Sequence, residues 1–171
     1  MLITLTDQDL RRAGNEARGR RTGTTNRSAV EPAMLHTRTG EDRLQIDVDS
    51  CCGELAVAKA LDLPWTGETG DKYIPNNPDV GTNIEVKTKF GDHDGLYLPL
   101  TKLYALKPST CIVVTRVETI NTVRLLGWIK ADYVEPASYP HGRNNRIFAN
   151  IVPIDRLWPI EKLVKHYAAI R

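Results

Sequence analysis

Hydrophobic and polar residues alternate with a period of two over residues 83–90, which is the pattern of a strand with one buried face. The glycine-bounded residues 91–95 predict a hairpin turn into the next strand. Asn121 marks a second expected turn, between an apolar run typical of a buried strand and the strand that follows it. The predicted strands cover residues 83–90, 96–100, 110–117 and 122–130.

Helices are predicted where capping residues precede a suitable segment or where apolar residues recur at three- and four-residue intervals. Thr6 is the expected N-cap of the first helix, with acidic residues in its first turn. Glycines weaken this helix beyond Arg18, so residues 19–40 are expected to form an arm or loop. Asp49 or Ser50 is expected to cap the second helix. The predicted helices cover residues 7–18, 50–61, 101–106 and 160–170, and the last of them is amphipathic.

The order of these elements predicts one mixed domain of the α/β or α+β class. Residues 1–45 are expected to form a basic N-terminal helix and arm, and residues 46–171 a core domain that ends in the amphipathic helix. A chain of 171 residues, 41% of them hydrophobic, is long enough to bury a core. No segment approaches the ~18 apolar residues of a membrane span. The start resembles no secretory signal, so the cytoplasm is the expected compartment.

The three cysteines predict neither a disulfide framework nor a structural zinc site. Cys51 and Cys52 are adjacent, and no C-x-x-C pair or histidine lies at zinc spacing. Reduced and mostly buried thiols are therefore expected.

Basic residues are unevenly distributed, although the net charge of +2 by itself indicates no partner. Arginine-rich segments that contain glycine suit phosphate contacts, because the guanidinium fork matches phosphate oxygens. A solvated surface without a partner is the alternative interpretation. The residues expected to contact nucleic acid are Arg11, Arg12, Arg18, Arg20, Arg21, Arg27, Lys89, Arg143 and Arg146.

Two carboxylates and a lysine around residue 85 have the chemistry of a magnesium site. Asp79 and Glu85 can meet if they lie on adjacent antiparallel segments, which a tight turn at Gly81 permits. Residues two apart in a strand share a face, so Lys87 is expected beside Glu85 while Val86 points into the core. Magnesium prefers oxygen ligands, and the lysine can orient water or neutralise phosphate charge. The carbonyl of Val86 is a further candidate ligand.

At these residues the chain resembles the PD-(D/E)XK nuclease superfamily. The match comprises Pro78-Asp79, then Glu85-Val86-Lys87-Thr88, and Glu54 on the preceding helix, within residues 48–130. The resemblance implies a restriction-endonuclease-like αβββαβ core with a central mixed sheet flanked by helices. It also implies cleavage of DNA, or less often RNA, with Mg²⁺ as cofactor and Mn²⁺ able to substitute. The implied catalytic residues are Glu54, Asp79, Glu85 and Lys87, and the implied metal ligands are Asp79, Glu85, Val86 and Glu54.

The spacing between Asp79 and Glu85 resembles that of resolvase-like and restriction-like members. A subgroup with a glutamine after the motif is disfavoured, because residues 96–100 contain none. Two other classes stay open: a non-catalytic nucleic-acid-binding module, and an assembly protein that shares the strand pattern. Asp92, His93 and Asp94 fit turn chemistry better than a metal site. A homodimer would suit an enzyme that cuts both strands, but no dimer surface is predicted.

Overall fold

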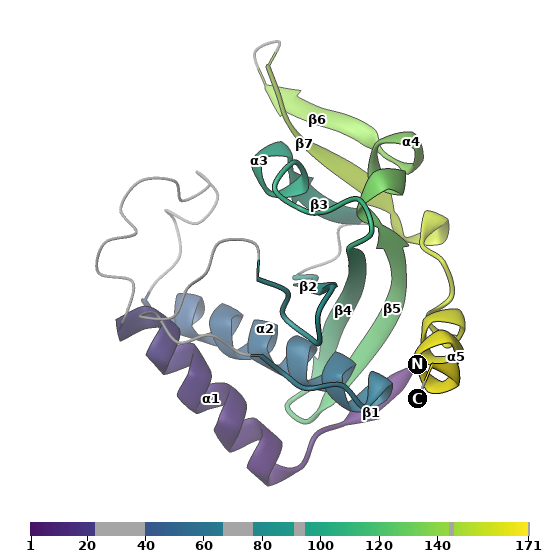
Figure 1. The fold of residues 1–171 in the computed structure, drawn as a ribbon. Coiled ribbons are helices and arrows are strands. Elements are labelled where there is room, and N and C mark those ends of the chain that lie inside the picture. Colours follow the sequence, from purple (N-terminus) through teal and green to yellow (C-terminus); the bar gives the residue numbers. More distant parts are fainter. Residues whose placement is uncertain (23–39, 67–76, 91–94, 144–145, 171) are drawn as a thin grey trace.

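The computed structural model describes residues 1–22, 40–66, 77–90, 95–143 and 146–170, and the structural statements below refer to these residues. They form a mixed α/β fold with two sheets (Figure 1). The mixed class that the sequence predicted is confirmed. The side chains of residues 21, 22, 40, 41, 143 and 146 are outside this description.

The first sheet has four strands in the order β1 (Leu2–Thr4), β5 (Thr122–Lys130), β4 (Cys111–Thr119) and β2 (Ile84–Thr88). β2 runs parallel to β4, and the other neighbours are antiparallel. The helices α1 (Asp7–Thr22) and α2 (Gly40–Leu61) pack together, with α2 against the sheet, and α5 (Ile160–Ala169) contacts α2 and β5. β2 is therefore an edge strand, with α2 covering one of its faces.

The second sheet is antiparallel, in the order β3 (Gly95–Pro99), β7 (Arg146–Pro153) and β6 (Tyr139–Arg143). The short helices α3 (Leu100–Leu103) and α4 (Val134–Ala137) contact this sheet. The 3₁₀ helices η3 (Ala131–Tyr133) and η4 (Ile154–Arg156) complete the elements. Figure 1 shows β6 and β7 projecting from the end of the molecule opposite α1 and α5.

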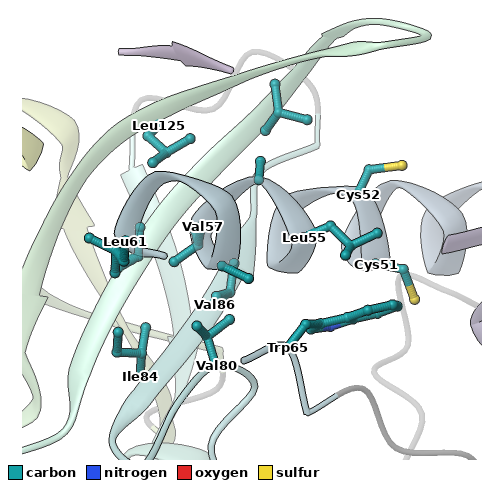
Figure 2. Close-up of a cluster of buried hydrophobic side chains, with 14 of the residues drawn as sticks. Cys51, Cys52, Leu55, Val57, Leu61, Trp65, Val80, Ile84, Val86 and Leu125 are labelled. Carbon is teal, nitrogen blue, oxygen red and sulfur yellow. The ribbon is translucent and has the colours of Figure 1, made fainter. Parts of the chain in front are cut away.

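β4 joins two hydrophobic cores because it is buried on both faces. Cys111 and Val113 belong to the core beneath α1, α2 and α5, whereas Ile112 and Val114 belong to the core shared with the second sheet. Figure 2 shows the first core, with side chains of α2 lying beside the buried side chains of β2. All three cysteines are buried and unpaired, as predicted.

The strands predicted around residues 84–88, 96–99, 111–117 and 122–130 are confirmed, as are α3, α5 and the capped start of α1. At that start, the Asp9 N–H donates to Thr6 Oγ1 at 3.2 Å, and the Thr6 N–H donates to Asp9 Oδ2 at 2.8 Å. This reciprocal capping box satisfies two backbone donors that a helix terminus leaves without partners.

Two predictions about helix bounds are wrong, the start of α2 and the end of α1. α2 begins at Gly40, so Asp49 and Ser50 lie inside the helix, and the predicted boundary between residues 45 and 46 also falls within it. The earlier turns of α2 are held because Leu44 and Val48 pack at helical spacing against the first core. α1 continues to Thr22; residues 23–39 of the predicted arm lie outside the described residues.

The third error concerns the strand pair predicted around residues 91–95. β3 does not pair with β2; it belongs to the second sheet and pairs with β7. Its Leu96 and Leu98 are buried in the second core, and that burial determines where the strand lies. Residues 91–94 themselves lie outside the described residues.

A glycine lets α2 approach the sheet closely. A Cβ atom at Gly53 would lie 2.6 Å from Thr115 Oγ1 and closer still to Thr88 Oγ1. These two hydroxyls are hydrogen-bonded to each other at 3.0 Å, so they are not free to move independently. The neighbouring position on the helix carries Glu54 to the edge of the sheet.

We expect Gly53→Ala to destabilise the protein by about 1–2 kcal/mol, because overpacking outweighs the gain in helix propensity. Gly14→Ala in α1 is the matched control: its new Cβ would meet nothing closer than Arg18 Nη1 at 3.9 Å. That variant should be neutral or up to about 1 kcal/mol more stable. Urea unfolding measures both, and equal stabilisation of the two variants would contradict the close approach at Gly53.

Candidate active site at the edge of the first sheet

A tight turn places Asp79 beside β2. Val80 forms antiparallel bridges with Trp65 on one side and Ile84 on the other. Gly81 adopts a φ of +59° within the turn, a conformation that favours glycine. The Asp79 carboxylate accepts a hydrogen bond from the Val86 N–H, with Oδ2 at 2.7 Å from the nitrogen. The turn predicted at Gly81 is confirmed, and it brings Asp79 to the edge of β2 that faces away from β4.

Glu85 and Lys87 share the face of β2 that is opposite α2. Val86, between them, points into the first core, as the alternation predicted. Lys87 Nζ donates to Glu85 Oε1 at 2.5 Å. Lys102 of α3 reaches the same oxygen at 3.0 Å. The buried Glu85 carboxylate therefore lies between the ammonium groups of Lys87 and Lys102, whose side chains are each 29% exposed.

Glu54 lies at the same edge but is held by other groups. The Arg20 guanidinium donates to both carboxylate oxygens, from Nη1 to Oε1 at 2.8 Å and from Nη2 to Oε2 at 2.6 Å. The Trp65 indole N–H donates to Oε2 at 2.8 Å. Arg12 lies over the same indole, with its Cζ atom 4.6 Å from the ring centroid. Helices α1 and α2 are thus joined through a buried carboxylate.

The charges of these groups act on one another. Burial, followed by the charges of Glu54 and Glu85, raises the pKa of Asp79 to about 7. Burial opposes ionisation of Glu85, but Lys87 and Lys102 outweigh it and lower the pKa of that carboxyl group. Burial also opposes the charge of Lys87, yet Glu85 and Asp79 outweigh it and raise the pKa of its ammonium group. The predicted residues Glu54, Asp79, Glu85 and Lys87 therefore form one electrostatic cluster.

We expect the stability of the chelator-treated protein to carry a pH-dependent contribution from Asp79. A carboxyl whose pKa is raised on folding binds its proton more tightly in the folded state than in the unfolded state. The contribution of Asp79 to the free energy of unfolding should therefore be largest below its ordinary pKa of 3.8. It should be lost as the pH rises to the raised pKa of about 7. Glu54, Glu85 and Lys87 are the charged groups that act on it.

The measurement compares urea unfolding of the wild-type protein and Asp79→Asn in EDTA between pH 4 and pH 8. The wild type should lose stability relative to the variant as the pH rises through this range. Asp132→Asn, at an exposed position, controls for removal of a carboxylate from the surface. A constant difference between the wild type and Asp79→Asn would contradict the predicted shift.

Oxygen atoms at the edge of β2 fit the preference of a magnesium ion. The N–H and C=O groups of a strand residue point to the same side, so the Val86 carbonyl faces the same edge as the N–H that Asp79 binds. Glu85 contributes a second carboxylate. Among the described residues, no group of three or more His, Cys, Asp or Glu side chains is arranged to hold a metal ion. A cation here would need backbone, water or substrate oxygens besides these carboxylates, which is usual for magnesium.

The residues expected to contact nucleic acid have different surroundings. Arg11, Arg12 and Arg18 are exposed on α1, whereas the Arg20 guanidinium is engaged by Glu54. Lys89 is half-buried just beyond β2, and its backbone N–H donates to the Thr115 carbonyl oxygen. Arg27 and the side chains of Arg21, Arg143 and Arg146 lie outside the described part of the chain.

Sequence reasoning missed two partners of the acidic residues. Lys102 and Trp65 were not among the predicted site residues, yet each contacts a site carboxylate. No local pattern distinguishes them, because both contacts depend on tertiary structure. The sequence feature that could have pointed to Lys102 is its position on the short helix that follows β3.

Comparison with known proteins found no matching family model, no matching curated protein and no matching solved structure. Within the described residues, no helix is both long enough and apolar enough to cross a membrane.

Proposed function

We propose that the protein is a metal-dependent endonuclease that hydrolyses phosphodiester bonds in DNA and is related to the PD-(D/E)XK superfamily. One observation carries the proposal: the Asp79 carboxylate binds the backbone of Val86, midway between Glu85 and Lys87, at the edge of β2 that faces away from β4. This arrangement joins the three residues of the motif in space as well as in sequence.

The order of the elements around the site supports the same relationship. α2 is followed by two isolated antiparallel bridges, one between Trp65 and Val80 and one between Val80 and Ile84 at the start of β2. α3 and then β4 follow, and β4 is parallel to β2. With the bridged residues taken as two short strands before β2, this succession supports an αβββαβ core, and β3 is an addition in the second sheet. The restriction-endonuclease-like core is accordingly part of the proposal.

Asp79, Glu85 and the Val86 carbonyl would hold the magnesium ion, and Mn²⁺ should be able to replace it. When bound, the ion neutralises phosphate charge and lowers the pKa of a coordinated water. Lys87 carries its charge beside Glu85, so its role is to orient the attacking water and to stabilise negative charge on the phosphate. Lys102 can supply a second positive charge from α3 when the substrate phosphate approaches Glu85.

Glu54 has a different role in this proposal from the one implied by the resemblance alone. Its oxygens are bound by Arg20 and Trp65, so it fixes α1 and α2 at the site and adds negative charge next to Asp79. As a direct metal ligand it would have to exchange one of these partners.

A non-catalytic nucleic-acid-binding module is the second candidate. The observation in its favour is that Glu54 and Glu85 are already paired with cationic side chains of the chain itself. Such pairing would suit a site that preserves the fold and no longer binds metal.

Purified protein incubated with supercoiled plasmid, linear duplex and branched DNA tests the proposal, with Mg²⁺, Mn²⁺ or EDTA. We expect cleavage with either metal and none with EDTA. DNA binding without cleavage in any metal would favour the second candidate, and neither binding nor cleavage would favour an assembly protein. Sedimentation of the protein alone and with DNA tests whether a homodimer forms.

A further inference from the structure

The second sheet has one buried face and one aromatic face. Leu96, Leu98 and Val152 point inward to the second core. Tyr97 alternates with the two leucines and so faces outward, and it is 39% exposed. Tyr97 and Tyr139 are both paired with Ile151. These three residues therefore form one row that crosses β3, β7 and β6 on the outer side of the sheet.

Two more rings extend this row toward the end of the hairpin. His141 lies edge-on to Tyr97, with ring centroids 5.7 Å apart, and edge-on to Phe148 at 5.4 Å. The register shifts between His141 and Gly142, which leaves Phe148 as an extra residue of β7. Such a bulge re-aims a side chain, and here the Phe148 ring lies against His141. We call Tyr97, Tyr139, His141 and Phe148 the aromatic face.

The charges of the second sheet are of one sign. β3, β6 and β7 contain no aspartate or glutamate, whereas Arg143 and Arg146 form the last register pair of the β6–β7 hairpin. Tyr139 is 52% exposed and Phe148 44% exposed, so much of the ring surface is open to solvent. A polyanion with flat apolar groups is the partner that suits both properties.

We propose that the aromatic face binds unpaired bases of single-stranded DNA by stacking. Aromatic side chains in a positively charged setting bind single strands in this way with little sequence preference, because every base has a flat π surface. The inference rests on the proposed function only in taking DNA as the partner, and it adds that the preferred substrate contains unpaired nucleotides.

The chain connects this face directly to the candidate active site. α3 follows β3 without a gap, and it carries Lys102, which contacts Glu85. Tyr97 and Lys102 are therefore on consecutive elements. A single strand held on the aromatic face would be anchored on β3, the element directly before the helix that contributes a cation to the site.

Binding is measured by fluorescence anisotropy with a labelled oligodeoxythymidine and EDTA, so that no cleavage can occur. The double variant Tyr97→Leu/Phe148→Leu should weaken binding about tenfold or more, because stacking is lost while apolar area is retained. Tyr97→Phe and Tyr139→Phe keep the rings and should bind like the wild type. Tyr133→Leu, at a 50%-exposed ring outside the sheet, is the matched control and should also bind normally.

Photo-crosslinking of the wild-type protein to an oligonucleotide containing 5-iodouracil provides a test that depends on no variant. The crosslinked peptides should contain residues of the aromatic face. Equal affinity of the wild type and the double variant, or crosslinks confined to other elements, would overturn the inference. It would also be overturned if the double variant converted a dimer into a monomer without changing DNA affinity, since the face would then bind a second copy.

The outcomes separate this inference from the proposed function. If plasmid is cleaved but the oligonucleotide is not bound, the inference fails and the proposed nuclease stands. If the oligonucleotide is bound through the rings but no metal supports cleavage, the inference stands and the nuclease proposal fails.

Discussion

Lys87→Ala should lower the rate of DNA cleavage by about a thousandfold, which is within the range expected for loss of a group that assists water attack. The protein should still fold, because Glu85 keeps Lys102 as a partner at 3.0 Å. Asp79→Asn should abolish cleavage as well, because an amide is a poor magnesium ligand, while its oxygen can still accept the Val86 N–H. Both rates are measured under single-turnover conditions with saturating Mg²⁺.

Lys107→Ala and Asp132→Ala are the controls for these variants, since both positions are exposed and lie outside the site. They should cleave at the wild-type rate. Circular dichroism and urea unfolding verify that each variant is folded. A fully active Asp79→Asn or Lys87→Ala protein would refute the assignment of this site.

The second large effect concerns stability. Arg20→Ala should destabilise the protein by about 3 kcal/mol, because it leaves the buried Glu54 carboxylate without its ionic partner. Arg20→Lys should recover only part of this loss, since an ammonium cannot form the two parallel hydrogen bonds of the guanidinium group. Urea unfolding in EDTA measures the effect independently of metal.

Arg18→Ala is the matched control, because Arg18 is exposed on the same helix and binds only Asn15 among the described interactions. It should change stability by less than about 0.5 kcal/mol. The double variant Arg20→Ala/Glu54→Gln should be less destabilised than the sum of the single variants, because the two residues interact directly. Strict additivity, or an Arg20→Ala protein as stable as the wild type, would contradict the proposed coupling of α1 to α2.

The strands nearest the site could be predicted because their patterns are local. β2 alternates strictly, and β4 is a continuous apolar run whose residues enter two cores. β6 and β7 were missed because Pro140, Gly142 and Pro153 interrupt any strand pattern, so this segment resembled a loop. β7 pairs with both β6 and β3, and this pairing forms a sheet that the sequence of the segment does not predict.

The site could be predicted only in part for a similar reason. Asp79, Glu85 and Lys87 are close in sequence, and one turn and the strand period suffice to bring them together. Arg20 and Lys102 reach the site from α1 and from the helix beyond β3. Their positions depend on how whole layers pack, which no spacing of residues reveals. Arg20 was expected at a phosphate, and the structure instead pairs it with Glu54.

The hydrogen bond from Val86 to Asp79 makes one backbone amide a reporter of the site. Its nitrogen is 2.7 Å from a carboxylate oxygen, whereas amides in the middle of a sheet donate to carbonyls. In a ¹H–¹⁵N spectrum this resonance should move when Asp79 is protonated or replaced and when Mg²⁺ is added. Metal occupancy and carboxyl ionisation could then be followed at a single nucleus, with no substrate present.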